Sequence, residues 1–380
     1  MSADPAAVLA ALPLLDHHCH GIVLADLADA DVEAMLTEGG APPAGASAFD
    51  TPLGLSVRRH CAPLLDLPPH ADPVDYLARR RELGGEEVAR RMLGASGTGL
   101  FVVDTGFRAG ELAGPAELAA LAGAGAQART VVRLEAVADA LLGRGVDPGE
   151  FRAAFAAALS AEIGRTLAVG LKSIAAYRTG FDLDPSRPAV DELAAAVVAT
   201  GGRARHPALS RELLWAGAEL GLPIQVHVGL GDRDVRLHAC DPTLLTDLIE
   251  LLPPVPLLLL HCWPYHRQAA YLASIWPTVH LDLGLTTQHV GPTRAAAVLA
   301  EAMEVTPFGK LLYSSDAFGL AEHYLLGALG LRRALAAVLG ERVASTEWSA
   351  SDAVRVAGLI ARGNAERIYD LRQAPSAGVG

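Results

Sequence analysis

Short apolar runs alternate with longer alanine-rich stretches through most of this chain, and this alternation constrains the fold more than any other feature. The apolar runs suit buried strands of a parallel sheet, and the stretches between them begin near Asp, Pro or Ser and stop at Gly, as helices do. Repeated strand and helix units of this kind are typical of a parallel sheet covered by helices. Eight runs are predicted to be strands, at residues 12–20, 99–106, 130–137, 166–174, 222–229, 255–262, 278–285 and 310–317.

Eight strands separated mostly by helices predict an α/β fold of the (β/α)8 TIM-barrel type rather than an open, doubly wound sheet. Residues 22–95 fit the alternation least, because they are rich first in Pro and Gly, in "GGAPPAGA", and then in Arg and Glu, in "ARRRELGGEEVARRM". We interpret them as a mostly helical insertion after the first strand that covers one face of the barrel. Residues 1–380 are then expected to form a single barrel domain.

The composition argues against some partners and favours others. Hydrophobic residues make up 51% of the chain and charged residues 19%, which is enough for a large core. The 31 basic and 43 acidic residues give a net charge of −12, which argues against a nucleic-acid partner and suits a bound cation. We expect a small-molecule substrate and a homo-oligomeric assembly.

The sequence predicts neither a membrane protein nor a secreted one. No apolar run approaches the roughly 20 residues needed to cross a bilayer. The opening "MSADPAAVLAALPLL" lacks a basic start and a small-residue cleavage site, so we do not interpret it as a signal peptide. The four cysteines are far apart and form no Cys-x-x-Cys pair, which indicates reduced thiols in a cytoplasmic protein. They are Cys19, Cys61, Cys240 and Cys262.

The first predicted strand ends in the stretch "LLDHHCHG", residues 14–21, which is unusually rich in side chains that bind metals. Side chains on a strand alternate between faces, so Asp16, His18 and His20 are expected on one face and His17 and Cys19 on the other. Two imidazoles would then converge on one point. By itself, this stretch also fits a solvated polar turn after a helix.

Polar side chains recur at the ends of the other predicted strands, where a barrel of this type carries its chemistry. Taken singly, a histidine at a strand end is more often a hydrogen-bonded core residue than a ligand, and a lysine more often extends to solvent. Taken together, they are costly to bury unpaired, and a divalent ion such as Zn²⁺, Mn²⁺ or Fe²⁺ removes that cost. The set comprises His18, His20, Glu135, Lys172, His227, His261 and Asp316.

This arrangement resembles the amidohydrolase superfamily, with H-x-H on the first strand, Lys on the fourth, His on the fifth and sixth, and Asp on the eighth. The closing "GNAERIYDL" looks like the last helix of the amidohydrolase-2 branch. The stretches "VGLKSIAAYRTG", "QVHVGLGDRD" and "YSSDAFGLAEHYLLGA" are similar to the amidohydrolase-like half that some fungal and plant proteins carry fused to a glutamine-synthetase-like domain. The present sequence contains no synthetase half.

The resemblance implies a role for each matching residue. His18, His20 and Asp316 would hold the first metal, and His227 would be the next ligand. His261 would either bind a second metal or orient the water and the substrate carbonyl. In two-metal relatives the lysine at the position of Lys172 is carboxylated and bridges the ions, whereas many amidohydrolase-2 proteins use one ion without it. Glu135 is an alternative bridge, so the number of ions stays open.

The implied reaction is hydrolysis of an amide, or of a related C–N or ester bond, by a metal-activated water, most plausibly with Zn²⁺. Asp316 would take the proton of the water and hand it to the leaving group, while His261 would stabilise the oxyanion. Similarity to the synthetase-linked proteins suggests a γ-glutamyl amide, with Arg178 meeting its α-carboxylate; a salt bridge from Arg178 to Asp182 or Asp184 fits equally well. His323 lies at the cavity mouth in one interpretation and at a surface helix start in another.

Three other functions remain open at this point. A decarboxylase and a sugar-acid isomerase reuse the same metal scaffold, and the fold alone does not separate them from a hydrolase. A non-catalytic regulatory module is the third alternative. The complete set of ligands argues against it, because a module without turnover has no need of Asp316 together with four histidines.

Overall fold

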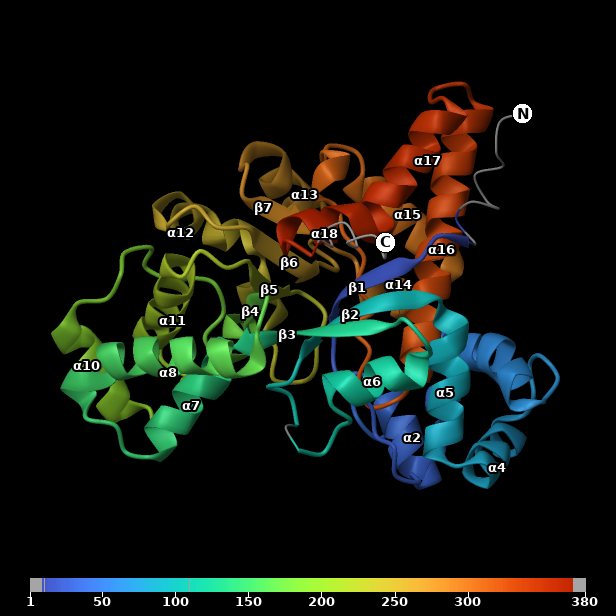
Figure 1. The fold of residues 1–380 in the computed structure, drawn as a ribbon, viewed down its shortest axis with the longest axis horizontal. Coiled ribbons are helices and arrows are strands. Elements are labelled where there is room, and N and C mark those ends of the chain that lie inside the picture. The colour runs from blue at the N-terminus through green and yellow to red at the C-terminus, as the bar shows by residue number, and fades with distance from the viewer. Residues whose placement is uncertain (1–8, 10, 109, 372–380) are drawn as a thin grey trace, which may run out of the picture.

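A computed structural model of the protein describes Leu9, residues 11–108 and residues 110–371. Most of the opening segment considered above as a signal peptide therefore lies outside the described residues. Seven parallel strands lie side by side in chain order and form one curled sheet (Figure 1). They are β1 (Leu14–Cys19), β2 (Thr98–Asp104), β3 (Gln127–Arg133), β4 (Gly170–Ser173), β5 (Ile224–Val228), β6 (Leu257–His261) and β7 (Val279–Leu281).

The eighth predicted strand, residues 310–317, lies between β7 and β1 without forming a regular strand. On one side, Leu312 N donates to Leu281 O at 3.0 Å. On the other side, His17 N donates to Tyr313 O at 3.1 Å and Asp316 N donates to His18 O at 3.0 Å. These bonds join the first and last strand positions, and the predicted TIM-barrel fold is confirmed.

The strands are shorter than predicted, and at two of them a helix occupies part of the predicted range. The predicted strand 130–137 ends at Arg133, and Glu135 lies instead in the first turn of α7 (Leu134–Gly143). An acidic residue is favourable there because the amino end of a helix carries partial positive charge. Helix α8 (Phe151–Thr166) continues to the point where the predicted strand 166–174 begins, so β4 contains only four residues.

Helices cover the outside of the sheet, as the alternating pattern predicts. In Figure 1 α7, α8, α10 and α11 gather on one side of the molecule, and the long α16 stands on the other side. Besides α7 and α8, the helices of this layer are α6 (Pro115–Ala122), α9 (Ala175–Arg178), α10 (Val190–Ala199), α11 (Pro207–Glu219), α12 (Thr246–Leu251), α13 (His266–Ile275), α14 (Thr286–His289), α15 (Pro292–Ala302), α16 (Glu322–Ala344), α17 (Ala350–Gly358) and α18 (Asn364–Ile368).

The segment after β1 is mostly helical, which confirms the predicted insertion. It contains α2 (Asp29–Met35), α3 (Pro52–Ser56), α4 (Pro73–Leu83) and α5 (Gly85–Ser96). These helices share a second hydrophobic core with β1, β2 and α16, in which Phe49 packs against Tyr76 and Phe101 packs against Tyr324 of α16. A buried ion pair between Arg80 and Glu322, 2.8 Å long, also ties α4 to the start of α16.

The barrel interior is a separate small core, distinct from the larger core between sheet and helices. It is filled by strand residues and is joined by Ala365 and Tyr369 from the end of the chain's last helix. Gly170, at the start of β4, lies so close to Tyr369 that a Cβ there would come within 3.0 Å of Tyr369 Cε1. Tyr369 therefore closes the amino end of the barrel. The strand residues are Leu15, Leu100, Val102, Val131, Leu258, Leu260 and Leu312.

Two further findings concern the environment of the chain. Among the described residues, no helix combines the length and the apolar character that crossing a membrane requires. All four cysteines are buried and unpaired.

Candidate metal centre

Strand β1 contains a bulge just before its histidines reach the carboxyl end of the barrel. Asp16 pairs with Phe101 and Cys19 pairs with Val103, so β1 advances three residues while β2 advances two. An inserted residue of this kind interrupts the alternation of side chains. His17 and His18 accordingly both contact residues inside the barrel, and the prediction that His17 shares a face with Cys19 is wrong.

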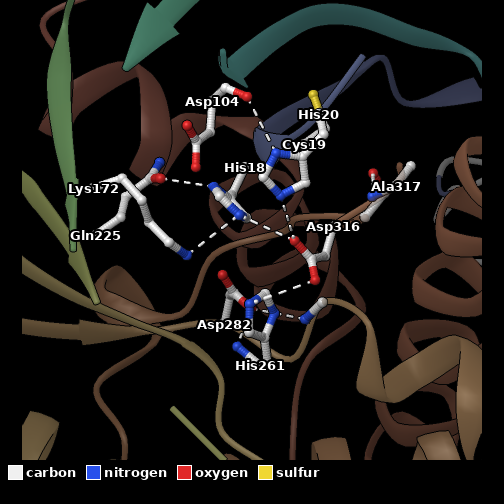
Figure 2. Close-up of polar contacts among 12 residues, drawn as sticks. His18, Cys19, His20, Asp104, Lys172, Gln225, His261, Asp282, Asp316 and Ala317 are labelled. Atoms are coloured by element: carbon white, nitrogen blue, oxygen red, sulfur yellow. Dashed lines mark hydrogen bonds and ion pairs between the residues drawn. The ribbon is translucent and has the colours of Figure 1, made fainter. Parts of the chain in front are cut away.

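Three histidines, two from the end of β1 and one from β6, converge on one carboxylate. His18 Nε2 lies 3.0 Å from Asp316 Oδ1, and His20 Nε2 lies 3.5 Å from the same oxygen. His261 Nε2 lies 3.5 Å from the other oxygen, Asp316 Oδ2. Figure 2 shows the three rings directed toward Asp316. One ligand atom from each of His18, His261 and Asp316 fits within a span of 4.8 Å, as the ligands of a single metal ion do.

His227 and Lys172 lie next to this cluster. The His227 ring is 4.6 Å from the His261 ring, centre to centre, and on its other side is 4.5 Å from the Tyr177 ring. Lys172 Nζ lies 3.4 Å from His18 Nε2. The structure therefore brings together six of the seven residues to which the sequence gave a possible metal-binding role, all except Glu135.

The backbone at two of these residues adopts the left-handed conformation that side chains other than Gly rarely adopt. His261 has φ = 68° and Asp316 has φ = 52°. Alternation along β6 would place His261 with Leu257 and Leu259, which pack against the outer helices. The left-handed turn brings its ring to the cluster instead. A strained backbone of this kind persists only where surrounding contacts hold it in place, and it occurs most often at functional sites.

Buried imidazoles at this site are held in the neutral form that binds metals. Burial, reinforced by the charge of Lys172, lowers the pKa of His18 to about 3. Burial also lowers the pKa of His261, and it brings that of His227 well below the usual value, with the nearby His261 contributing. Burial alone would raise the pKa of Asp316, but the histidines around it keep that pKa well below its ordinary range.

The donor atoms of the cluster fit a divalent ion. His227 Nε2 and both ring nitrogens of His261 are buried and have no hydrogen-bond partner among the described residues. Polar atoms buried in this way are costly unless something satisfies them. Imidazole nitrogens with a carboxylate are the ligands that zinc and neighbouring transition metals prefer.

Neighbouring groups orient two of the ligand rings. His20 Nδ1 donates to the carbonyl oxygen of Asp104 at 3.1 Å, and His18 Nδ1 donates to Gln225 Oε1 at 2.7 Å. Each bond leaves the Nε2 lone pair free to face the cluster. The Asp104 carboxylate is itself paired with Arg133 at 2.6 Å.

A cavity of about 520 Å³ opens above the cluster and includes His18, His20, Lys172, His227 and Asp316 in its lining. Its walls carry as many acidic as basic side chains, five of each. The basic residues are Arg133, Lys172, Arg178, Arg203 and Arg205, and the acidic residues are Glu38, Asp139, Asp232, Asp234 and Asp316. A larger cavity of about 720 Å³ lies beyond Phe107 and Arg133 but contains none of the six predicted ligands.

The family of this chain follows from a comparison with known proteins. Residues 60–371 match the family model Amidohydro_2, described as amidohydrolase. The chain belongs to the Amidohydro_2 family. The predicted resemblance is thereby confirmed.

Other known proteins are similar to this Amidohydro_2 chain in sequence or in fold. Protein fluG of Emericella nidulans is 31% identical over 282 residues, which span 65% of this chain and only 33% of fluG. A solved structure from Lactobacillus casei, provisionally named a metal-dependent hydrolase, is 25% identical, covers 98% of both chains and has a TM-score of 0.85. A uronate isomerase from Bacillus halodurans shares the fold, with a TM-score of 0.69, 13% identity and coverage of 97% and 96%.

Of the two predicted substrate-binding residues of this Amidohydro_2 chain, one lines the cavity and the other does not. Arg178 lines the cavity, but its Nη2 pairs with Asp139 at 2.7 Å and not with Asp182 or Asp184. Its Nη1 is buried without a hydrogen-bond partner among the described residues. His323 is not among the lining residues, because its Nδ1 bonds to Gln288 and its Nε2 to Met35 O.

Sequence analysis missed several residues that support the cluster. Asp104 and Asp282 each follow an apolar run at a strand end, the same signal that identified Asp316. Gln225 shares a strand face with His227, two positions earlier, and period-two counting could have found it. Glu135, considered as a metal bridge, instead accepts a bond from Ser173 Oγ at 2.8 Å and does not line the cavity.

Proposed function

We propose that this chain is a metal-dependent hydrolase that cleaves an amide, or a related C–N or ester bond, in a small molecule. The convergence of three buried imidazoles on the Asp316 carboxylate, at the floor of a cavity, carries the proposal. His18, His20, His227 and Asp316 would hold the first ion, most plausibly zinc, with manganese or iron as alternatives. When bound, such an ion polarises the scissile carbonyl and makes water acidic enough to attack it at neutral pH.

Asp316 has the position and the charge of a general base. His18 and His20 contact its Oδ1, so Oδ2 is the less encumbered oxygen. The low pKa of Asp316 keeps the carboxylate deprotonated and ready to accept the proton of the attacking water at Oδ2. The same oxygen then returns the proton to the leaving nitrogen or oxygen. His261, beside Oδ2, either holds a second ion or orients the substrate carbonyl.

In this proposal, the number of ions that the site holds depends on whether Lys172 is carboxylated. Burial lowers the pKa of Lys172 to about 8, against the opposing charges of Asp316 and Asp104. A lysine with such a pKa has an uncharged fraction near neutral pH, and the uncharged amine is the form that carbon dioxide carboxylates. Its place beside His18 Nε2 supports a carboxylated lysine that bridges two ions.

The charges of the cavity favour a substrate with a carboxylate. Arg178 lines the cavity, and its buried Nη1 has no partner within the part of the chain that the structure describes, so a substrate carboxylate would satisfy it with a charge-assisted bond. The equal numbers of acidic and basic side chains suit a zwitterionic group such as the α-amino acid end of a γ-glutamyl amide. We propose a γ-glutamyl amide as the first substrate to test, with Arg178 at its α-carboxylate.

A sugar-acid isomerase is the second candidate, because a sugar acid also offers a carboxylate to Arg178. The solved uronate isomerases share the fold with this chain over almost its whole length. A direct comparison of the two reactions uses the metal-loaded protein with γ-glutamyl-p-nitroanilide and, separately, with D-glucuronate. We expect release of p-nitroaniline that stops after treatment with a chelator and returns with zinc. Conversion of D-glucuronate to a keto sugar, without p-nitroaniline release, would favour the isomerase.

A further inference from the structure

The hydroxyl of Tyr369 lies deep inside the barrel, although the residue enters from the end of the last helix. The side chain is buried among the apolar residues of the barrel interior. Its hydroxyl oxygen lies 2.8 Å from Gln225 Nε2 and 3.1 Å from His17 Nδ1. A phenylalanine would fill the same space, so the hydroxyl serves another purpose than packing.

Each partner of Tyr369 leads to a different residue of the metal cluster. Gln225 Oε1 lies 2.7 Å from His18 Nδ1, on the ring whose Nε2 faces Asp316. His17 Nε2 lies 2.8 Å from Asp282 Oδ2. The other oxygen, Asp282 Oδ1, accepts from the backbone N–H of His261 at 2.9 Å. Figure 2 shows Gln225 beside His18 and Asp282 beside His261.

With both imidazole rings neutral, one arrangement of protons satisfies these contacts. The backbone oxygen of His17 can only accept, so the Gln225 atom 2.6 Å from it must be Nε2, and Oε1 must face His18. Since Oε1 can only accept as well, His18 Nδ1 carries the proton and His18 Nε2 is bare. Gln225 Nε2 also donates to the Tyr369 oxygen, so the Tyr369 hydroxyl proton is free to go to His17 Nδ1.

The proton positions on the path from Tyr369 through His17 to Asp282 follow from those on the path through Gln225 to His18. With Nδ1 of His17 accepting from Tyr369, the proton of the neutral ring sits on Nε2 and is donated to Asp282. Asp282 is thereby held in place to accept from His261 N and Gly284 N. That contact secures the left-handed backbone at His261, which aims its ring at Asp316.

We propose that Tyr369 is a positioning residue that sets the affinity of this site for its divalent ion, by holding Gln225 against His18 and by holding His17 and Asp282 at the backbone of His261. The inference rests on the metal centre of the proposed function and not on the substrate. Outer groups that orient metal ligands typically change metal affinity by about 10- to 100-fold when they are removed.

Zinc titration of the metal-free protein against a chromogenic chelator tests this proposal without any substrate. Tyr369→Phe should raise the dissociation constant for Zn²⁺ by about 10- to 100-fold. Tyr313→Phe is the matched control, because Tyr313 is as buried as Tyr369, comes three residues before Asp316 in the chain, and its hydroxyl has no hydrogen-bond partner among the described residues. The control should bind zinc like the parent.

A second variant covers the case in which Tyr369→Phe does not fold. The methionine of Gln225→Met has a similar length but cannot make the bonds of Gln225 to Tyr369 and His18. This variant should weaken zinc binding by a similar factor. Where both variants fold, the double variant should lose little more than the larger single loss, because the two act along one path. Nitrogen NMR of the zinc-loaded parent should show His18 protonated at Nδ1, and in Tyr369→Phe the His17 ring nitrogens should shift, because His17 Nδ1 loses its bond to the hydroxyl.

The outcomes separate the two proposals. Unchanged zinc affinity in folded Tyr369→Phe, or in Gln225→Met if only that variant folds, overturns the positioning role while leaving the metal centre standing. A parent chain that binds no zinc, manganese or iron overturns the metal centre itself, and the role of Tyr369 with it. An equal loss in Tyr313→Phe would also overturn the inference, because it would assign the effect to general destabilisation.

Discussion

His18 Nε2 lies 3.0 Å from Asp316 Oδ1 because the first and last strand positions of the barrel are neighbours, with Asp316 N donating to His18 O at 3.0 Å. The ligand pair therefore depends on closure of the barrel, and neither half of the chain could form it alone. This relationship joins the fold to the proposed chemistry, since the same backbone bond that completes the barrel places the base beside the ligand.

Asp316→Asn is expected to harm turnover more than folding. The amide keeps the volume of the carboxylate but cannot accept the proton of the attacking water, so kcat should fall by about 10²- to 10⁴-fold, the usual range for general acid–base catalysis. KM should change much less, because Arg178 is untouched. Steady-state kinetics on the first substrate found, with metal content measured in parallel, checks this. Near-parental kcat at full metal occupancy would assign the base to another group.

Lys172→Ala is expected to lose the second ion if the parent holds two. The uncharged amine of Lys172 is the form that can be carboxylated, and a short carboxylate added in solution should partly replace it. Metal analysis with and without bicarbonate measures the effect. Lys310→Ala is the control, because Lys310 bonds backbone oxygens of Ala273 and Trp276 outside the cluster. A parent with one ion that Lys172→Ala leaves unchanged would give Lys172 a role in substrate binding or packing.

Arg178→Met is expected to weaken binding of substrates that carry a carboxylate. Hydrogen bonds to charged groups contribute about 1.5–3 kcal/mol, so KM for γ-glutamyl-p-nitroanilide should rise by about 10- to 100-fold, with a smaller change in kcat. Arg90→Met serves as the control, since Arg90 is exposed and pairs with Glu86 and Glu87 in the insertion. Equal KM values for Arg178→Met and the parent would remove Arg178 from the substrate site.

Glu38→Gln is expected to change how stability depends on pH. Burial, with help from Asp316 and Asp232, raises the pKa of Glu38 from 4.5 to about 8. A carboxyl group with a raised pKa in the folded state stabilises the fold below pH 4.5, and this contribution is lost as the pH rises toward 8. The glutamine does not titrate, so the variant does not lose stability in this way. Urea unfolding of the metal-free proteins should therefore show that the free energy of unfolding of the variant rises relative to that of the parent between pH 5 and pH 8. A difference that does not vary with pH would contradict the shift.

Much of the fold and most of the candidate metal centre were predictable because both leave local signals. Each strand is an apolar run, and each ligand follows such a run at the end where a parallel barrel exposes its chemistry. His18, His20, His261 and Asp316 were found by this rule. Residues 310–317 were also placed correctly as the closing element, although they form backbone bonds to both neighbours without becoming a regular strand.

The features that sequence analysis missed depend on contacts between distant residues. Period-two counting cannot reveal the bulge in β1, because the extra residue is visible only against its partner strand. The partner of Arg178 is Asp139 on a helix packed beside it, whereas the sequence offered only the nearby Asp182 and Asp184. His323 follows Asp316 closely in the chain, yet α16 holds its ring nitrogens on Gln288 and Met35, outside the cavity lining.

Metal analysis of the His18→Ala/His20→Ala double variant tests the central claim most directly. His280→Ala is the matched control, because His280 is also a buried strand histidine, but within residues 11–108 and 110–371 its ring bonds to Thr278 O alone. The account predicts one or two divalent ions per chain in the parent and in His280→Ala, and a heavy loss of metal from the double variant while its circular dichroism stays parental. A folded double variant that keeps the full metal content of the parent would contradict the assignment of this cluster as the metal centre.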